Sequence, residues 1–218
     1  MKIVTVLRSG GIFGPEHVRW LYDQLDCKYE KICLSDIEIE GIKTIPLTTN
    51  YPGWWAKIEL FDPNKILDDI FYLDLDTVIV GDITELLENR KLTMLSDFFR
   101  PDKTKNSALM LIPHREKARV WNTFNRFPEL FMKRYKKGGD QEFINKIYPD
   151  AETWQDLYPN NIVSYKTHVI HKKKNQYTTR YSIGNGSLPS DAKIVCFHGQ
   201  PRPWDSGEIW VKDINNYK

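Results

Sequence analysis

The segment Ile70-Phe71-Tyr72-Leu73-Asp74-Leu75-Asp76 places two carboxylates directly after a four-residue apolar run. The apolar run predicts a buried strand, and alternate residues of an extended segment point to the same side. Asp74 and Asp76 can therefore face one point at the carboxyl end of this strand. Open α/β sheets bind their ligands at that edge. Two hard oxygen ligands there suit Mg²⁺ or Mn²⁺, with water and phosphate oxygens completing the coordination.

The chain on either side of this segment alternates between predicted strands and helices. The opening predicts a strand at 2–7, a helix from Pro15 and a strand at 29–34, which is the β–α–β unit of a mostly parallel sheet. Further strands are expected at 92–95, 108–112 and 194–197, and helical segments at 54–61, 115–127 and 140–147. From about residue 148 the alternation weakens, and the basic, turn-rich stretch 171–191 favours a flap.

Composition and charge exclude several classes of protein. The 218 residues are 41% hydrophobic and 28% charged, a globular balance that argues against disorder. Thirty-one Lys and Arg against 29 Asp and Glu give a net charge of +2, too balanced for a dedicated nucleic-acid binder. The three cysteines lack metal-ligand spacing, and no apolar run could span a membrane. A cytoplasmic protein without a transmembrane segment is therefore expected.

A second polar cluster follows the last predicted strand, in the stretch Phe197-His198-Gly199-Gln200-Pro201-Arg202-Pro203-Trp204. Imidazole is a reasonable third ligand beside two carboxylates, particularly for Mn²⁺. His198 is therefore predicted to join Asp74 and Asp76 at the metal. The guanidinium of Arg202 can bind phosphate in a fork geometry.

Five short sequence motifs, in order along the chain, resemble motifs of nucleotide-sugar glycosyltransferases of the GT-A fold. The resemblance is closest to glycosyltransferase family 8, the glycogenin and lipopolysaccharide galactosyltransferase group. Trp55-x-Lys57 is similar to a Tyr-x-Arg element, Tyr72–Asp76 to the YLDxD metal motif, Asn106–Met110 to N-[ST]-G-[VM]-M, Asp140-Gln141-x-x-x-Asn145 to D-Q-x-x-x-N, and Gly199-x-x-Arg202-Pro203-Trp204 to G-x-x-K-P-W. One departure concerns the metal: Cys196 stands where the family has its metal-binding His. His198 lies two residues later, on the same face if the segment stays extended.

This resemblance implies a fold and an activity. The fold is a single α/β, GT-A-like (Rossmann-like) domain with a mostly parallel sheet flanked by helices and an irregular C-terminal third. Residues 1–147 would form the nucleotide- and metal-binding core, and residues 148–218 the flap and donor-closing loop. The activity is metal-dependent transfer of a hexose from a nucleotide diphosphate sugar, expected to be a UDP-sugar, to a glycan or other hydroxyl acceptor. Retention of anomeric configuration is implied by the resemblance alone.

The resemblance also implies roles for single residues. Asp74, Asp76 and His198 would bind the metal, Mn²⁺ or Mg²⁺, and Lys57 and Arg202 would bind the diphosphate. Asn106 and the catalytic pair Asp140 and Gln141 would contact the sugar. Gly199 and Trp204 would belong to the loop that closes over the donor. Ser9, Gly10 and Asp36 follow the first two strands, where the nucleotide would lie. A tight turn at Ser9-Gly10 and a capping role for Asp36 are the alternatives. The run 172–174 is either a solvated face or a site for an anionic acceptor.

Two other interpretations of the D-x-D segment stay open. Apolar residues followed by D-x-D-x-V resemble the first motif of haloacid-dehalogenase-type phosphatases, with Asp74 as nucleophile and Asp76 as acid/base. That family opens on this motif, whereas here a β–α–β unit precedes it and no convincing paired-acid motif follows. The remaining interpretation is a non-catalytic relative that binds a sugar nucleotide or glycan without turnover. The chain is also short for the family, so an additional acceptor or membrane-attachment segment is not expected.

Overall fold

The predicted buried strand at 70–73 lies in the middle of a seven-stranded sheet in the computed structural model, which describes residues 1–100, 104–172 and 181–218. The strand order is β3-β2-β1-β4-β7-β6-β8. The bounds are Lys2–Leu7 for β1, Lys31–Ser35 for β2, Lys43–Pro46 for β3, Ile70–Leu73 for β4, Thr93–Ser96 for β6, Lys105–Ile112 for β7 and Glu152–Thr153 for β8. β1 pairs in parallel with β2 and β4, β2 with β3, and β6 with β8. β7 runs antiparallel to its neighbours β4 and β6, so the mostly parallel sheet is confirmed.

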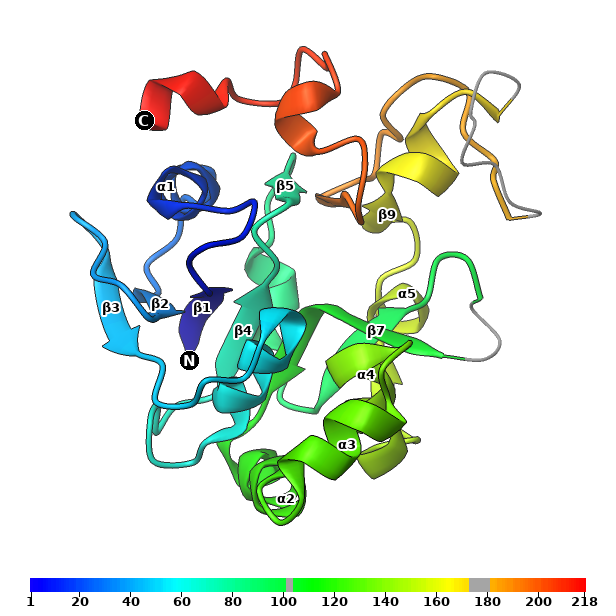
Figure 1. The fold of residues 1–218 in the computed structure, drawn as a ribbon. Helices are drawn as coiled ribbons and strands as arrows, with labels where there is room; N and C mark the ends of the chain where they lie inside the picture. Colours follow the sequence, from blue (N-terminus) through cyan, green and yellow to red (C-terminus); the bar gives the residue numbers. More distant parts are fainter. Residues whose placement is uncertain (101–103, 173–180) are drawn as a thin grey trace.

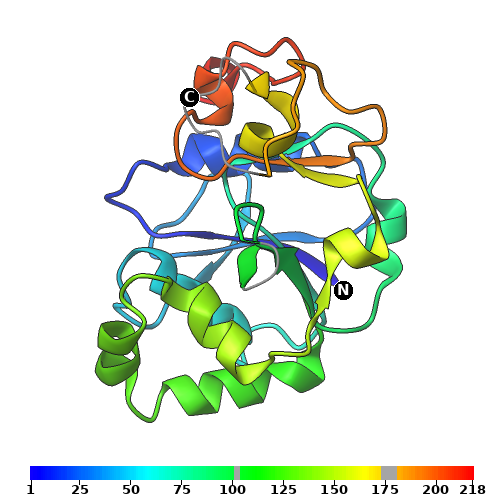
Figure 2. The same cartoon turned by 90° about the vertical axis from the view of Figure 1, so that its right-hand side faces the viewer.

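Helices cover both faces of this sheet (Figures 1 and 2). On one face lie the 3₁₀ helix η1 (Gly53–Phe61) and the helices α2 (His114–Phe124), α3 (Pro128–Arg134) and α4 (Gly139–Ile147). α1 (Pro15–Asp23) covers the other face. The strands supply alternate residues to the two apolar cores: Ile3 and Phe71 belong to the core beneath α1, whereas Val4 and Tyr72 belong to the core beneath η1 and α2. Burial on both faces explains why the central strands are continuous apolar runs rather than alternating ones.

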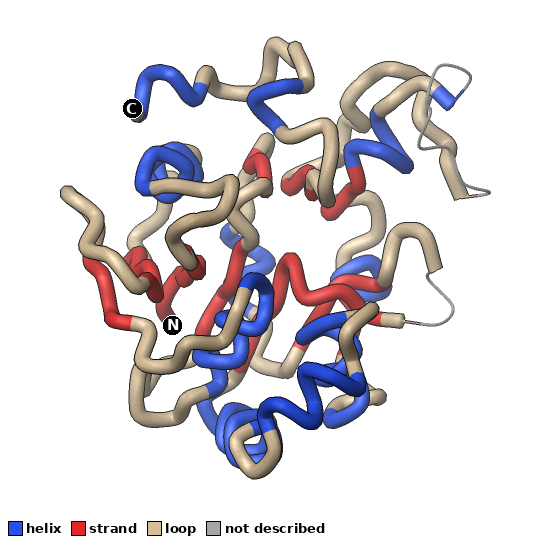
Figure 3. The backbone as a smooth tube through the Cα atoms, viewed as in Figure 1, coloured by secondary structure: helices blue, strands red, loops and turns tan. Residues whose placement is uncertain are grey.

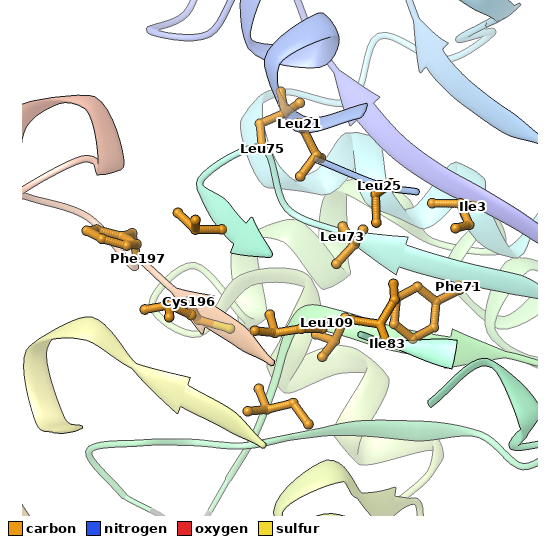
Figure 4. Close-up of a cluster of buried hydrophobic side chains, with 14 of the residues drawn as sticks. Ile3, Leu21, Leu25, Phe71, Leu73, Leu75, Ile83, Leu109, Cys196 and Phe197 are labelled. Atoms are coloured by element: carbon orange, nitrogen blue, oxygen red, sulfur yellow. The ribbon is translucent and has the colours of Figure 1, made fainter. Parts of the chain in front are cut away.

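A second, three-stranded sheet lies above the first on the α1 side. Its order is β5-β10-β9, with bounds Thr77–Ile79, Ile194–Cys196 and Ile162–Ser164. β10 is antiparallel to β5 and parallel to β9. Figure 4 shows side chains of both sheets in one buried cluster, with Leu73 and Leu109 from the large sheet and Cys196 from the small one. The two sheets are therefore halves of one packed unit.

The remaining short elements are η2 (Thr84–Glu88), α5 (Trp154–Leu157), the π-helix η3 (Tyr165–Val169), η5 (Pro203–Asp205) and η6 (Ile214–Tyr217). Figure 3 shows that the chain after β9 is mostly loop, so the irregular C-terminal third is confirmed. Residues 173–180 lie outside the described residues. They make up most of the basic part of the predicted flap and include Lys173 and Lys174 of the basic run. The following stretch is fastened to η3, because Ile183 and Gly184 both donate backbone hydrogen bonds to the carbonyl oxygen of Thr167.

Several boundaries differ from the sequence-based expectation. The helix expected at 115–127 ends at Phe124, and a separate helix begins at Pro128. Proline disfavours the helical conformation of the residue before it and is well suited to the first helical position. Four short strands, β3, β5, β8 and β9, were not predicted. Residue 147 is the predicted end of the nucleotide- and metal-binding core. β8 lies after this residue and yet joins the large sheet, whereas β5 lies before it and joins the small sheet.

Candidate active site

A pocket of about 670 Å³ opens at the carboxyl end of β1 and β4. Such an edge is the usual ligand site of an open α/β sheet. Most residues singled out in the sequence line it: Ser9, Gly10, Lys57, Asp74, Asp76, Asn106, Asp140, Gln141, His198, Gly199 and Arg202. They come from segments spread between residues 9 and 202, and the fold gathers them at one point. Asp36 and Trp204 are not among the lining residues.

Asp74 and Asp76 stand on the connection between the two sheets. Asp74 directly follows β4 and its amide donates a 2.9 Å hydrogen bond to the Ala108 carbonyl oxygen, while β5 begins directly after Asp76. The carboxylate of Asp74 accepts a hydrogen bond from the Tyr72 hydroxyl and lies 2.7 Å from the Lys57 ammonium. Burial opposes the charge of Lys57, but Asp74 and Asp140 outweigh it and raise the pKa of Lys57. This lysine is therefore a fixed cation of the pocket.

The second carboxylate of the motif is paired with the closing loop. Asp76 is 7% exposed, and its Oδ2 accepts a charge-assisted hydrogen bond from the Arg202 guanidinium. Burial and the neighbouring charge of Asp74 raise the pKa of Asp76 to about 7, although Arg202 and Lys57 act in the opposite direction. A buried carboxylate beside a second one needs such cations to stay ionised.

Asp140 enters the pocket from the first turn of α4. It is buried, and its Oδ2 accepts a 2.7 Å hydrogen bond from the Ser107 hydroxyl of β7. Burial raises the pKa of Asp140, whereas Lys57 counteracts that rise. Gln141 and Asn106 line the pocket beside it, and the Asn106 Oδ1 accepts a 2.8 Å hydrogen bond from the Ala108 amide. Polar groups of two different elements thus converge at the place predicted for the sugar.

The loop 198–204 is fastened at both ends. The ammonium of Lys166, in the π-helix η3, donates a 2.7 Å hydrogen bond to the His198 carbonyl oxygen. At the other end the Trp204 ring lies 4.4 Å from the His17 ring and 5.7 Å from the Trp20 ring, both on α1. Trp204 therefore holds the loop against α1, which differs from its predicted place at the ligand. The Arg202 guanidinium between these anchors lies 5.0 Å from the Phe13 ring centre.

Asp36 acts on the first loop rather than on the pocket itself. Its two carboxylate oxygens accept 2.8 Å hydrogen bonds from the Ser9 amide and the Ser9 hydroxyl. Gly10, next in the chain, has a φ of +80°, which side chains disfavour. Asp36 thus shapes the turn that lines the pocket, in agreement with the capping alternative.

The predicted set of metal ligands is not brought together. The His198 Nε2 lies 2.6 Å from the Ser164 hydroxyl oxygen, and its ring stacks on Phe98 at 5.6 Å with 10° between the planes. Burial and the Lys166 charge lower the pKa of His198 to about 4. The reason lies in the backbone: β10 ends at Cys196 and the chain turns at Gly199, with a φ of +81°. The alternation on which the prediction rested therefore does not reach His198.

Cys196, at the position of the family histidine, does not complete the set either. Its thiol is 2% exposed, and Figure 4 shows the sulfur directed into the buried apolar cluster. Across residues 1–100, 104–172 and 181–218, no group of three His, Cys, Asp or Glu could hold a metal ion. The two carboxylates alone are suitable ligands, but each already binds a cationic side chain. This donor set does not fit a resident divalent cation.

Several residues of the site were given no role from the sequence, among them the following. Tyr72 and Ser107 support the two acidic groups, Arg8 lines the pocket after β1, and Lys166 supports the closing loop. Tyr72 could have been found, because it stands two residues before Asp74 and so shares its side of the strand. Lys166 gave no signal, since the π-helix that carries it is defined by i→i+5 hydrogen bonds, such as that from the Ile170 amide to the Tyr165 carbonyl oxygen, and not by a sequence pattern.

Comparisons with known proteins bear on the fold. No protein-family model matches the chain. Inositol phosphorylceramide glucuronosyltransferase 1 of Arabidopsis thaliana is 24% identical over 173 residues, which are 75% of this chain and 31% of that protein. The structure of the glycosyltransferase GlyE of Streptococcus pneumoniae superposes with a TM-score of 0.66 at 18% identity, over 99% of this chain and 61% of that one. An active-site mutant of LgtC superposes with a TM-score of 0.65 at 12% identity, over 100% of this chain and 94% of that one.

These likenesses define the class of fold. The chain has the fold of GT-A glycosyltransferases of the family 8 type, and both the predicted resemblance and the predicted fold class are confirmed. The chain spans 31% of the length of the curated relative and 61% of the GlyE chain. None of the helices within the described ranges has the length and apolar character needed to cross a bilayer.

Proposed function

We propose that this chain transfers a sugar from a nucleotide diphosphate donor, a UDP-sugar, to a hydroxyl group of an acceptor. The observation that carries the proposal is the convergence of Lys57, Asp140 and Arg202 with the D-x-D motif in one pocket of a glycosyltransferase fold. Cations suit the diphosphate of such a donor, and acidic and amide groups suit the hydroxyls of its sugar. The pocket volume of about 670 Å³ lies in the range of small-molecule sites.

The roles within the pocket follow from charge and position. Lys57 and Arg202 would stabilise the negative charge that develops on the departing diphosphate, which is electrostatic catalysis by groups already in place. Asp140 and Gln141, which also line the pocket, would bind the transferred sugar. The resemblance implies retention at the anomeric carbon, and we include retention in the proposal. The predicted Mn²⁺ or Mg²⁺ is not part of the proposal, because the side chains predicted as its ligands do not form a metal site.

Two similar proteins support a UDP-hexose or UDP-hexuronate as the first donors to test. One is named a glucuronosyltransferase, and another structure is that of the galactosyltransferase LgtC in complex with donor and acceptor sugar analogs. That structure superposes over 100% of this chain with a TM-score of 0.62 at 12% identity. The acceptor is proposed only as a hydroxyl compound.

A donor panel tests the proposal directly. The full chain would be incubated with UDP-glucose, UDP-galactose, UDP-glucuronate, UDP-N-acetylglucosamine and GDP-mannose, and the release of nucleoside diphosphate would be measured. We expect release from one UDP-sugar, and NMR of the product would show the anomer. Release of inorganic phosphate from a phosphomonoester would instead favour the phosphatase, and binding without release would favour the non-catalytic relative.

The variant Asp140→Asn sharpens this experiment. We expect turnover to fall on the order of 10²-fold, the effect of removing one preorganised charged group from a site. Asp150→Asn is the matched control, because Asp150 is exposed and does not line the pocket. Equal turnover in both variants would contradict the role of Asp140.

A further inference from the structure

We infer that Arg202 takes the charge-neutralising role of a divalent cation at the D-x-D motif, so that this chain binds its nucleotide diphosphate without metal. The inference rests on the proposed function and deepens it, since it concerns how the same pocket receives the donor. It starts from the ion pairs on the two carboxylates.

Both carboxylates of the motif are already neutralised by side chains. Lys57 lies 2.7 Å from Asp74, and Arg202 donates directly to Asp76. All four side chains are largely buried, with exposed fractions between 11% and 23%. A metal ion bound to the remaining oxygens of both carboxylates would add two positive charges beside these two cations in a low-dielectric pocket, where like charges repel strongly. The two carboxylates of the motif therefore hold the Lys57 and Arg202 side chains in place.

The residues that would complete a metal site are committed elsewhere. The His198 ring is held between Ser164 and Phe98, and the Cys196 sulfur lies among apolar side chains. Of the predicted ligands, this leaves the two carboxylates, and each is already paired with a cationic side chain. A metal held there would depend on water and on the donor itself.

Arg202 is in contrast fixed in place before any ligand binds. Asp76 and the Phe13 ring hold its guanidinium, and the loop that carries it is anchored by Trp204 on α1 and by Lys166. A guanidinium keeps its charge at all physiological pH values and presents several donors in a plane. Asp76 binds the Nη1 of that fork, and Arg202 lines the pocket, so its remaining donors are the groups that would bind phosphate oxygens.

The bonds, electrons and proton of the transfer step can be accounted for without a metal ion. The bond between the anomeric carbon and the diphosphate oxygen breaks, and its electron pair leaves with the diphosphate. The acceptor oxygen forms the new bond to the anomeric carbon, and its proton passes to the departing diphosphate. Arg202 and Lys57 neutralise the charge that builds up on the leaving group.

Isothermal titration of the full chain with UDP tests the inference. The titration would be run once in EDTA and once in Mn²⁺. We expect the two dissociation constants to agree within about threefold, which is less than 1 kcal/mol. Binding in Mn²⁺ but not in EDTA would overturn the inference and leave the proposed function intact. Absence of binding in both buffers would overturn the inference together with the proposed UDP-sugar donor.

Three variants separate the role of Arg202 from that of a metal. Arg202→Ala should weaken UDP binding roughly tenfold or more in EDTA, and Arg202→Lys should weaken it less, because charge is kept and the fork is lost. Arg115→Ala is the matched control, since Arg115 is 66% exposed and outside the pocket. Asp76→Asn should still bind UDP within about tenfold of the unchanged chain, because the guanidinium is retained. In the Mn²⁺ buffer, loss of UDP binding in Asp76→Asn with normal binding in Arg202→Ala would show a metal-bridged site and overturn the inference.

Discussion

At the scale of single residues, the Lys57 ammonium holds together the acidic side of the pocket. It pairs with Asp74 at 2.7 Å, and Asp140 and Asp76 also raise its pKa. Lys57→Met should lower the free energy of unfolding by about 3 kcal/mol, because removing one partner leaves buried carboxylates uncompensated. Urea unfolding at pH 7 measures this loss. Lys57→Arg keeps the charge and is the control; an equal loss in both variants would mean that packing rather than charge is responsible.

Gly139 is a second residue on which the pocket depends. Its φ is +65°, and a Cβ built there would lie 2.5 Å from the Trp54 Nε1 at the rim of the pocket. Gly139→Ala should cost about 1–2 kcal/mol of strain and, in addition, move Trp54 and reduce donor turnover. Gly41→Ala is the matched comparison: its φ is +77°, no described atom beyond its chain neighbours lies within 4 Å of the added Cβ, and it does not line this pocket. If the two variants lose the same stability and the same turnover, contact with Trp54 is unimportant.

At the scale of elements, a charge cluster ties together the three strands β3, β2 and β1 at one end of the large sheet. Glu30, just before β2, lies 2.6 Å from both Lys2 in β1 and Lys43 in β3. These hydrogen bonds, Lys2 first and then Lys43, lower the pKa of Glu30 to about 2 from its ordinary 4.5. The folded chain therefore binds this proton more weakly than the unfolded chain, so the contribution is full above pH 4.5 and disappears as the pH falls towards 2.

The variant Glu30→Gln should flatten that pH dependence. Between pH 4.5 and 2, the free energy of unfolding should fall less steeply in the variant than in the unchanged chain. Urea unfolding across this pH range gives both curves. Since the cluster is exposed, about 1 M salt should bring the two curves together. Parallel curves at low salt would show that the cluster contributes nothing to stability.

Most elements of the large sheet could be predicted from the sequence because each is an apolar run between turn residues. The buried strands at 2–7 and 70–73 are examples, with bounds that the structure reproduces. The small sheet could not be predicted in full, because β5 and β9 are three residues long. Such short segments acquire strand geometry from their partners rather than from their own composition.

The residues of the candidate site also differ in how far the sequence predicts them. Alternation along a strand was sufficient for Asp74 and Asp76, and the family resemblance led to Lys57 and Asp140, all of which line the pocket. Alternation failed for His198, where a glycine with positive φ ends the extended stretch. The resemblance failed for Trp204, whose anchoring on α1 depends on a contact across almost the whole chain length. Long-range packing of this kind is not encoded in any local pattern.

At the scale of the whole molecule, the C-terminal segment is fastened to α1. The buried Trp20 indole donates a 2.8 Å hydrogen bond to the Lys212 carbonyl oxygen, and Arg19 donates to the Tyr217 carbonyl oxygen. Trp20→Phe should lower the free energy of unfolding by roughly 1–3 kcal/mol, because it leaves a carbonyl oxygen unsatisfied. The melting temperature should fall by about 2–4 °C per kcal/mol for a chain of this size.

Trp210→Phe is the matched control for that experiment. The Trp210 indole donates a 3.1 Å hydrogen bond to the Glu208 carboxylate, which also accepts from the Tyr165 hydroxyl. Its loss leaves that carboxylate partnered, so the melting temperature should change less than in Trp20→Phe. An equal or larger change in Trp210→Phe would show that the link between Trp20 and the C-terminal segment is not specific.

The position of the D-x-D motif between the two sheets has a consequence for how the protein loses activity on heating. The Phe197 amide donates a 3.1 Å hydrogen bond to the Asp76 carbonyl oxygen, next to a sheet whose strands have only three residues each. Although its side chains belong to the buried core, this sheet has few backbone hydrogen bonds of its own, so we expect it to open before the large sheet on heating. Opening there would carry Asp76 away from Asp74 while the large sheet stays intact. Inactivation would then precede the loss of secondary structure, and native-state hydrogen exchange would detect it first at the amides of β5 and β10.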